Sequence, residues 1–510
     1  MDTLLHLLRF VGVLFLALMI LNVMILVHEW GHFLAARWRG LKVEKFQIWF
    51  GKPIWKKTVN GVQYGLGCIP MGGFVALPQM APMEAIEGSA DGPKEPLPPI
   101  SPLDKIIVAF AGPLFSFLLA LFFACIVWQI GRPIDEAANP TRIGFVDPKG
   151  AAAAAGLKAG DTIRKIDGTP VVRWHGAVES VQWAIVSSPH DDIQFEVERQ
   201  GESGLVTVPV KAPRRAQLED EEKKNATGGF FRQAMDSLLS RPPIRQVGIF
   251  PQEPPIISAL VPNSPAERAG LQRDDLILSL NGKPVPHMMD AVLTIQEARG
   301  KPIEFLIQRG SEQKTLVITP QVPTKPESLA KEQKAITGIV EWGTARDKNE
   351  RSYVNPFTQV TEVAISMKNT FAALFDRRTD LGVGHMSAAV KIVSIYYMLF
   401  EHPDPWSRIL WFSVVLNINL AIINLFPFPV LDGGHILMAL IEAVRRRPLN
   451  TKMLEIVQTA CVLLLLSYMG FVTLKDIGDL RGGGKTTIEF GPPPDTQTFP
   501  AAIDSQKSAH

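Results

Sequence analysis

Four long apolar runs limit what this chain can fold into more than any other feature. They cover residues 10–27, 106–130, 409–431 and 456–474. About 20 apolar residues suffice for a helix to cross roughly 30 Å of hydrocarbon, so each run can span a bilayer. The alternative for the first run is a cleavable signal peptide, but the run is long and no Ala-x-Ala cleavage site follows it. The sequence therefore predicts a polytopic α-helical membrane protein with four transmembrane helices.

Basic residues at the membrane edges predict the orientation. They cluster in two short loops, after the first run and between the third and the fourth: Arg37, Arg39, Lys42, Lys45, Lys52, Lys56 and Lys57, and then Arg445, Arg446, Arg447 and Lys452. Lys and Arg accumulate in short loops on the cytoplasmic side. Both loops are therefore expected in the cytoplasm, with both termini and the long segment 132–408 on the external side.

The charge of the whole chain is almost balanced. Lys and Arg number 52 against 50 Asp and Glu, for a net charge of +2, which removes the general argument for a nucleic-acid partner. The three cysteines are odd in number and widely spaced. No disulfide framework and no paired-cysteine metal site is expected.

The external segment contains an internal repeat. The stretch VDPKGAAAAAGLKAGDTIRKIDGTPVV, from Val146, aligns at one fixed offset with LVPNSPAERAGLQRDDLILSLNGKPVP, from Leu260. A repeat this long indicates two copies of a whole domain rather than a solenoid. The pattern of a short helix, an apolar strand and an Asn/Asp-Gly turn resembles a bacterial PDZ domain. We expect two tandem α+β PDZ-like domains, which either bind an extended peptide at strands 144–146 and 256–260 or serve as a steric spacer.

The first apolar run ends in the motif H-E-x-x-H, formed by His28, Glu29 and His32. On a helix, positions i and i+4 lie on one face, so both imidazoles can reach one Zn²⁺ while the glutamate acts as a general base. The motif also occurs by accident, with the glutamate paired to a nearby arginine. At the margin of a membrane span that explanation weakens, because an unpaired charge in hydrocarbon costs at least about 2.5–3.5 kcal/mol.

A catalytic zinc site uses three protein ligands, and the third candidate lies four hundred residues later. The third run ends in NLFPFPVLDGGH, where Pro427 and Pro429 must break a helix and Asp432 follows. This run descends from outside to cytoplasm, so its end lies at the same depth as the end of the first run. Asp432 can therefore complete the site. An ordinary Asp-Gly turn at a membrane edge is the alternative for this motif taken alone.

HEWGH at 28–32 and NLFPFPVLDGG at 424–434 resemble the two signature motifs of the site-2 protease family. The resemblance covers most of residues 1–480. It implies a zinc intramembrane endopeptidase of the bacterial inner membrane, which cuts transmembrane proteins such as an anti-sigma factor after a first cut by another protease. It maps His28, His32 and Asp432 to the ligands of one zinc per chain and Glu29 to the catalytic base, near the cytoplasmic side.

The same resemblance gives meaning to further segments. QYGLGCIPMGGFVAL, at 63–77, is similar to the family's membrane-re-entrant β-loop, whose strand edge either holds unwound substrate or only plugs the site. Its glycines, Gly65, Gly67, Gly72 and Gly73, are candidate substrate-binding residues. Asn424 either contacts the substrate backbone or oxyanion, or makes a bond between helices. For AGPLFS at 111–116, close helix packing is the preferred explanation.

The expected boundaries divide the chain into ten segments. They are a first transmembrane helix with HExxH (1–40), a cytoplasmic-side and re-entrant β-loop region (41–102), a second transmembrane helix (103–132), PDZ-like domain 1 (133–213), an insertion or linker (214–247), PDZ-like domain 2 (248–322), a juxtamembrane amphipathic region (323–406), a third transmembrane segment with LDGG (407–445), a fourth transmembrane helix (446–476) and a flexible tail (477–510).

Two other classes of function fit the sequence less well. A catalytically silent, PDZ-bearing membrane scaffold would not need Glu29 together with both halves of the ligand set. A zinc transporter would need a chain of polar residues across the membrane, whereas the candidate ligands cluster at one depth. The sequence therefore favours an intramembrane endopeptidase that acts in regulated intramembrane proteolysis, with lipid and transmembrane substrates as its partners.

Overall fold

The structure is a computed structural model. It describes residues 2–80, 100–133, 141–212, 244–298, 300–325, 335–343, 351–376, 378–379, 381, 389–402, 404–447, 449, 451–482 and 490. Most of the predicted insertion at 214–247, the 81–99 part of the segment before the second span, residues 382–388 and most of the tail after 482 lie outside these described residues.

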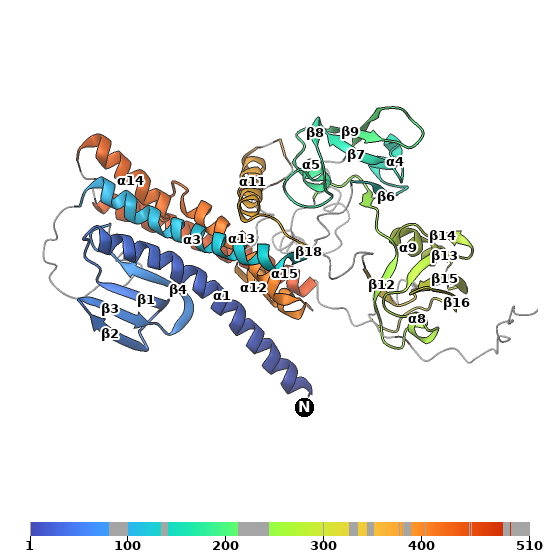
Figure 1. The fold of residues 1–510 in the computed structure, drawn as a ribbon, viewed down its shortest axis with the longest axis horizontal. Coiled ribbons are helices and arrows are strands. Elements are labelled where there is room, and N and C mark those ends of the chain that lie inside the picture. The colour runs from blue at the N-terminus through green and yellow to red at the C-terminus, as the bar shows by residue number, and fades with distance from the viewer. Residues whose placement is uncertain are drawn as a thin grey trace, which may run out of the picture.

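Long helices form one bundle (Figure 1). Their bounds are α1 (Asp2–Trp38), α3 (Pro102–Ile130), α11 (Pro356–Phe375), α12 (Ala389–Glu401), α13 (Pro405–Asn424), α14 (Asp432–Arg445) and α15 (Thr451–Gly482). Among the described residues, four stretches are long and apolar enough to cross a membrane: Leu8–Trp38, Pro102–Ile130, Pro405–Asn424 and Met453–Asp476. The prediction of four membrane-spanning helices is confirmed at this level of length and composition.

Helix α3 lies at the centre of the bundle. It packs against α1, α11, α13 and α14. Small side chains allow this: Ala120 and Ala124 are fully buried against Val360 of α11 and Val414 of α13. In lipid, helices associate through close packing of small residues, because burial of apolar surface gives no advantage there.

The sequence predicts a membrane span at 409–431, but the helix of this third apolar run ends before residue 431. Helix α13 stops at Asn424, and α14 begins at Asp432. Pro427 and Pro429 lie in the bend between the two helices, where each proline lacks the N–H that a helix needs. The bend returns the chain to α3, against which α14 packs.

A four-stranded sheet lies beside the C-terminal part of α1 (Figure 1). Strands β1 (Lys45–Phe50), β2 (Trp55–Val59), β3 (Val62–Leu66) and β4 (Ile69–Ala76) are arranged in the order β2-β3-β1-β4. β1 is parallel to β3 and antiparallel to β4. Phe33 of α1, Val75 of β4 and Val108 of α3 share one apolar core. The expected β-loop of 63–77 is thus the second half of a larger sheet that begins at Lys45.

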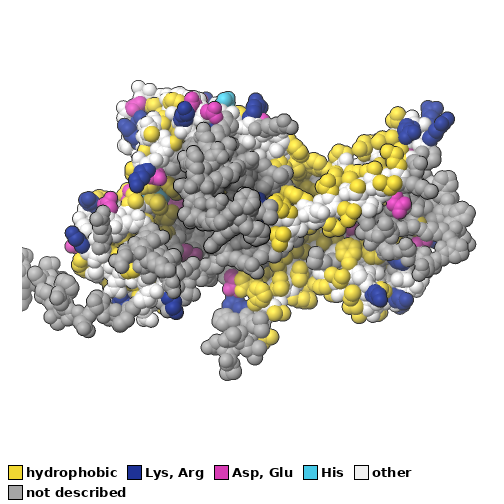
Figure 2. Space-filling view, turned by 180° about the vertical axis from the view of Figure 1, so that it is seen from behind, with side chains coloured by type: hydrophobic (Ala, Val, Ile, Leu, Met, Phe, Trp, Pro, Cys, Tyr) yellow, Lys and Arg dark blue, Asp and Glu magenta, His cyan; other side chains and the backbone are white. Residues whose placement is uncertain are grey.

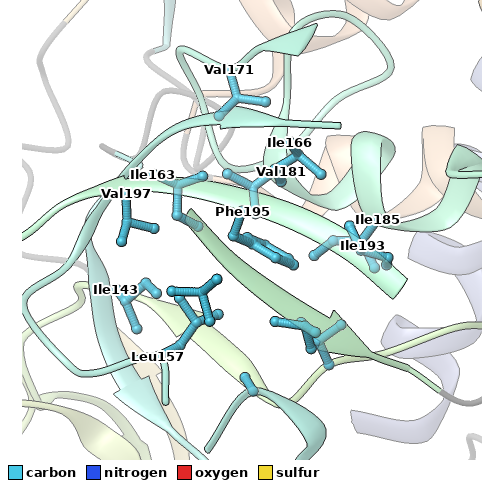
Figure 3. Packing of buried hydrophobic residues seen from close by; sticks show 14 of the residues in the cluster. Ile143, Leu157, Ile163, Ile166, Val171, Val181, Ile185, Ile193, Phe195 and Val197 are labelled. Carbon is cyan, nitrogen blue, oxygen red and sulfur yellow. The ribbon is translucent and has the colours of Figure 1, made fainter. Parts of the chain in front are cut away.

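The first repeat unit is an α+β domain at the other end of the bundle. It contains β6 (Ile143–Val146), α4 (Ala151–Ala155), β7 (Thr162–Ile166), β8 (Thr169–Pro170), α5 (Val181–Ser187), β9 (Asp192–Glu198), β10 (Leu205–Lys211) and β11 (Ile249–Pro251). One sheet has the order β10-β9-β7-β8, and β11 pairs with β6. Alternate residues of β9 point into the core that Figure 3 shows, where Ile193, Phe195 and Val197 have no exposed surface.

The second repeat unit follows the same order of elements. It contains β12 (Ile256–Leu260), α8 (Pro265–Arg268), β13 (Leu276–Leu280), β14 (Lys283–Pro284), α9 (Met288–Glu297), β15 (Ile303–Arg309), β16 (Glu312–Ile318) and β17 (Ile339–Gly343). Its sheet has the order β16-β15-β13-β12-β17, with β14 beside β13. The internal repeat of the sequence therefore corresponds to two units with matching elements.

Matching ion pairs stabilise the two units. Arg199 donates from Nε and Nη2 to the two carboxylate oxygens of Asp161, both at 2.8 Å. Arg309 makes the same two bonds to Asp275, both at 2.7 Å. Both aspartates are almost fully buried and occupy aligned positions of the repeat, so each buried carboxylate has a bidentate partner.

Of the two strands that we expected to bind peptide, β12 lies inside its sheet, whereas β6 is one strand of a two-stranded sheet. β6 pairs with β11 on one side, and on the other side Ile143 bonds with the segment that leads into β7. β12 lies between β13 and β17. The reason is that a strand from beyond each closing hairpin returns to pair with the first strand. β17 is therefore the edge strand on this side of the second unit, and peptide binding at 144–146 of β6 stays a prediction.

β11 also pairs with the first unit although the expected boundary at 248 assigned it to the second. The side chain of Arg245, 1% exposed, donates to the backbone carbonyls of Ser188, His190 and Ala212. These bonds fix the returning segment to the first unit before β11 begins. Val247 then enters the same core.

The two ends of the bundle differ in charge and in contacts. Figure 2 shows hydrophobic side chains covering the bundle and basic side chains at the end far from the repeat units. At that end Arg39 pairs with Asp104 at 2.6 Å, and Lys105 with Glu442 at 2.6 Å. The basic loops after α1 and after α14 thus lie at the same end of the bundle.

At the opposite end, the bundle is joined to the first repeat unit. β5 (Arg132–Pro133), which follows α3, pairs with β18 (Arg351–Ser352), which precedes α11. Glu362 of α11 lies 3.4 Å from Arg132 and 3.5 Å from Arg173 of the first unit. One carboxylate therefore connects the end of α3, helix α11 and the first unit.

A histidine lies in the contact between the two repeat units. His287 caps the N-terminus of α9, where its Nδ1 accepts a hydrogen bond from the Met289 N–H at 3.1 Å. Its ring stacks on Phe145 of β6 at 5.7 Å and lies 6.2 Å from Phe250 of β11. The side chain is fully buried, and this burial lowers the pKa of His287 to about 4.

The low pKa predicts a pH-dependent contact between the units. Because the folded pKa is below the ordinary value of 6.5, stabilisation by neutral His287 is complete above pH 6.5 and is lost as the pH falls toward 4. At pH 5 the loss is about 2 kcal/mol. Hydrogen exchange of the α9 amides, corrected for intrinsic rates, will show protection falling between pH 7 and pH 5. The variant His287→Gln lacks this titration, and an equal fall in that variant would contradict the prediction.

Candidate active site

Two imidazoles of α1 define the site. His28 and His32 are one helical turn apart on the same face, and their Nε2 atoms lie 3.3 Å from each other. The rings are nearly perpendicular, with centroids 4.9 Å apart. His28 is buried and His32 nearly so, which places both rings in the interior of the bundle rather than in lipid.

Helix α3 fixes the orientation of both rings. His32 Nδ1 lies 2.8 Å from the backbone carbonyl of Val108, and His28 Nδ1 lies 3.0 Å from Ser116 Oγ. A carbonyl can only accept, so Nδ1 of His32 carries the proton and its Nε2 presents a lone pair. A hydrogen bond to the other ring nitrogen is the usual support of a metal-binding histidine.

Glycines make room for the rings. A Cβ atom on Gly112 of α3 would lie 2.2 Å from His32 Nε2 and 2.8 Å from His28 Nε2. A Cβ atom on Gly31 of α1 would lie 2.4 Å from the Ala111 carbonyl oxygen. The close approach of α1 and α3 and the space in front of the two Nε2 atoms therefore both require glycine.

Asp432 reaches the two histidines from the first residue of α14. Its Oδ2 lies 3.2 Å from His28 Nε2, and its Oδ1 lies 3.3 Å from His32 Nε2. The two residues after it allow this position, because a Cβ on Gly433 would meet the Leu425 carbonyl oxygen at 2.2 Å and one on Gly434 the Phe428 carbonyl oxygen at 2.1 Å. The LDGG sequence thus packs the start of α14 directly on the proline bend.

The three residues fit a zinc ion. Ligand atoms placed about 2.0–2.2 Å from a tetrahedral ion lie about 3.3–3.6 Å from one another, close to the 3.2–3.3 Å separations that join Nε2 of each histidine to the other and to Asp432. Among the described residues, His28, His32 and Asp432 form the one group of this kind. Oδ2 of Asp432 is buried and has no hydrogen-bond partner in the described part of the chain. A buried carboxylate oxygen without a hydrogen-bond partner, next to two imidazole nitrogens, indicates a cation site.

Glu29 lies beside this group and faces strand β4. Its Cγ is 3.9 Å from the position that a Cβ of Gly73 would occupy. Its charge interacts with His28, His32 and Asp432, and its carboxylate accepts from the backbone N–H of Val75. His28, Glu29, His32 and Asp432 therefore lie together, and the edge strand β4 lies next to the glutamate.

The candidate substrate-binding residues are spread over the sheet. Gly73 lies next to Glu29, and Gly72 precedes it at φ +75°, beneath the Phe50 ring. Gly65 and Gly67 lie on and just after β3, which β1 separates from β4; a Cβ on Gly67 would clash with the backbone of Trp49 and Phe50. Close backbone packing accounts for Gly67, and contact of Gly65 and Gly67 with a substrate stays a prediction.

Asn424, the last residue of α13, reaches the histidines. Its Nδ2 donates toward His28 Nε2 at 3.3 Å. The contact links α13 to α1, as one of the two expected explanations requires. It also puts an amide donor directly at the edge of the candidate zinc site.

Sequence reasoning missed the residues that α3 contributes. Val108, Gly112 and Ser116 are spaced by four residues, so they form one stripe of the helix that matches the spacing of His28 and His32. AGPLFS was interpreted only as a packing motif, whereas Gly112 and Ser116 within it contact the histidine rings. The repeated spacing of small or polar residues in an apolar helix was the available signal.

Membrane-spanning helices that bring two imidazoles, an aspartate and a neighbouring glutamate together define a membrane-embedded metallopeptidase site. The family model described as peptidase family M50 matches residues 16–468. The chain belongs to this family. Its activity is that of a zinc metalloendopeptidase of the site-2 protease type, in regulated intramembrane proteolysis.

Curated relatives agree over most of the chain. Protease RseP of Yersinia pestis is 29% identical over 471 residues, which cover 90% of this chain and 97% of the relative. A putative zinc metalloprotease of Vibrio cholerae is 30% identical over 479 residues, 89% of this chain and 96% of the relative. Regulator of sigma-E protease RseP of Escherichia coli is 28% identical over 481 residues, 90% and 97%. A solved PDZ domain protein from Parabacteroides distasonis, with 10% identity over 37% of this chain and 96% of its own, has a TM-score of 0.12 and carries no argument.

The space at Gly112 gives a prediction. Gly112→Ala places a methyl group against both Nε2 atoms, so zinc content and cleavage of a membrane substrate are expected to fall by at least about tenfold. The matched control is Gly12→Ala in α1, where an added Cβ has no neighbour within 4 Å, and this variant is expected to leave both values unchanged. Metal analysis of the two purified variants measures the difference. Full zinc content and full activity in Gly112→Ala would contradict the account.

Proposed function

We propose that this chain hydrolyses peptide bonds within or near transmembrane segments, with one Zn²⁺ held by His28, His32 and Asp432 and with Glu29 as the catalytic base. The observation that carries the proposal is the convergence of His28, His32 and Asp432, whose ligand atoms all lie within 4.8 Å of one another, at one depth inside a bundle of membrane helices. A scaffold without activity would not require this convergence beside a glutamate.

The residues divide the chemistry among them. Zinc, when bound, supplies Lewis-acid activation of water and of the scissile carbonyl. Glu29 takes the proton of the attacking water on its carboxylate and transfers it to the departing amide nitrogen. Val108 and Ser116 hold the imidazoles in the orientation that presents Nε2 to the ion. The close packing of α1, α3 and α14 keeps lipid and excess water away from these groups.

We propose that Asn424 contacts the substrate. A lone pair at His28 Nε2 serves one partner at a time, so a ligand at Nε2 frees the Asn424 amide that now points to it. The freed N–H groups then lie at the edge of the site, where they can donate to the scissile carbonyl oxygen or to the neighbouring substrate backbone. A role limited to linking α13 and α1 is the alternative, and the two differ in their effect on kcat.

We propose that the substrate is bound as an extended strand along β4. A transmembrane helix hides its amides in internal hydrogen bonds, so hydrolysis requires local unwinding. β4 pairs with β1 on one side and lies at the end of the order β2-β3-β1-β4. Its other edge can therefore bond an unwound segment next to Glu29, as in strand addition to a sheet.

The family and the relatives support a proposal for the substrate class and the surroundings. We propose a membrane-spanning substrate, such as an anti-sigma factor, that another protease has already shortened, in the inner membrane of a bacterium. The end of the bundle with the basic loops is proposed to face the cytoplasm, with the repeat units and both termini outside. The repeat units are proposed to be PDZ-like domains that either bind a peptide or exclude bulky external domains.

A direct assay tests the catalytic assignment. Purified protein in detergent with a fused transmembrane substrate is expected to cleave it, and Glu29→Gln is expected to lower cleavage by at least about a hundredfold while keeping zinc near one per chain. The variant retains both histidines and Asp432, so only proton transfer is lost. Cleavage that survives in Glu29→Gln would contradict the mechanism.

The third ligand has its own test. Asp432→Ala removes one of three protein ligands and is expected to lose both zinc and cleavage. Asp104→Ala is the matched control, because that aspartate pairs with Arg39 away from the site. Zinc bound at the original ratio in Asp432→Ala would exclude Asp432 as a ligand.

A further inference from the structure

Asn22 is a polar residue in the middle of the first membrane helix. Its side chain is 8% exposed. Nδ2 donates to the Leu18 carbonyl of its own helix at 2.7 Å and to the Pro70 carbonyl of β4 at 3.0 Å. Its Oδ1 is buried without a hydrogen-bond partner in the described chain. A buried amide with an unpaired oxygen is costly in an apolar region, so packing alone would favour an apolar residue here.

Helix α1 contacts β4 at two points, one at Asn22 and one at Glu29. Asn22 and Glu29 are seven residues apart, which is close to two helical turns, so they lie on one face about 10.5 Å apart. Asn22 contacts Pro70, and Glu29 lies next to Gly73. Three residues of strand cover about 10 Å. The two elements thus run side by side with equal spacing between their contacts.

The contact with Asn22 occurs where the sheet itself gives β4 little support. β1 and β4 are in register at Ile48 with Gly73 and at Phe50 with Ile69, but the register shifts between these pairs. Trp49, at φ 66°, lies opposite the extra residues 70–72. The ladder therefore holds β4 from Gly73 onward, and the segment 70–72 depends on other contacts. The bond from Asn22 ties this segment to the catalytic helix.

We propose that Asn22 is a positioning residue that fixes residues 70–72 of β4 against α1 and thereby sets which peptide bond of the substrate reaches Glu29. The proposal rests on the proposed pairing of substrate with the edge of β4. With Asn22 in place, residues 70–72 are held next to the part of β4 that passes Glu29 at Gly73. Without it, the first part of the edge is free to shift, so a paired substrate loses contacts on one side of the scissile bond.

The test compares two asparagines of the same kind. Asn22→Leu removes the bond to β4 and is expected to raise KM for a transmembrane substrate about tenfold, the effect of one lost buried hydrogen bond, with a smaller change in kcat. Mass spectrometry of the products is expected to find cleavage at additional neighbouring bonds. Asn417→Leu is the control, because Asn417 is also buried with an unpaired Oδ1, yet its Nδ2 donates to Ser413 of its own helix. This variant is expected to keep the KM and the cleavage position.

A second measurement does not depend on activity. Hydrogen exchange of the Met71 and Gly72 amides is expected to accelerate in Asn22→Leu, while the amides of Gly73–Ala76 stay protected by β1. Asn22→Gln, which keeps an amide donor, is expected to restore the single cleavage position. Unchanged exchange at residues 71–72, or one unchanged cleavage position with unchanged KM in Asn22→Leu, would overturn the proposal. Loss of zinc from Asn22→Leu would also overturn it, whereas failure of the proposed function itself appears separately, as cleavage by Glu29→Gln.

Discussion

The close approach of α1 and α3 is the constraint on which the rest of the molecule depends. Gly31 lies against the backbone of Ala111, and Gly112 lies against both imidazoles, so side chains at these two positions would separate the helices. At this distance the α3 stripe of Val108 and Ser116 can bond the outer nitrogens of the rings. The inner nitrogens then converge, and α14 delivers Asp432 onto them. Packing in lipid and chemistry are therefore served by the same contact.

Much of this arrangement could be predicted from the sequence. We could predict that His28, His32 and Asp432 form one site, because the apolar runs, the H-E-x-x-H spacing and the depth of LDGG all indicate it. The contribution of α3 could not be foreseen, because glycine and serine in an apolar helix have the same pattern whether they serve packing or ring orientation. The break after α13 was predicted from Pro427 and Pro429, whereas the hydropathy of the run alone placed its end at residue 431 rather than at Asn424.

The repeat units illustrate a different limit. Their internal similarity was evident from aligned residues such as Asp161 and Asp275, and the structure shows why, since each buried carboxylate binds an arginine of the following hairpin. The edge strand of the second unit was predicted wrongly, because β17 lies beyond the aligned stretch and pairs with β12. Pairings between distant segments leave no local pattern, and neither does the bond from Asn22 to Pro70.

X-ray absorption at the zinc edge of the purified protein tests the three proposed ligands most directly. Four-coordinate zinc is expected, with two imidazole nitrogens and oxygen ligands, all at about 2.0–2.2 Å. The signal of one imidazole is expected to disappear in His28→Ala. A site with sulfur at about 2.3 Å, or with a single imidazole in the unaltered protein, would contradict the assignment of His28, His32 and Asp432 as the ligands.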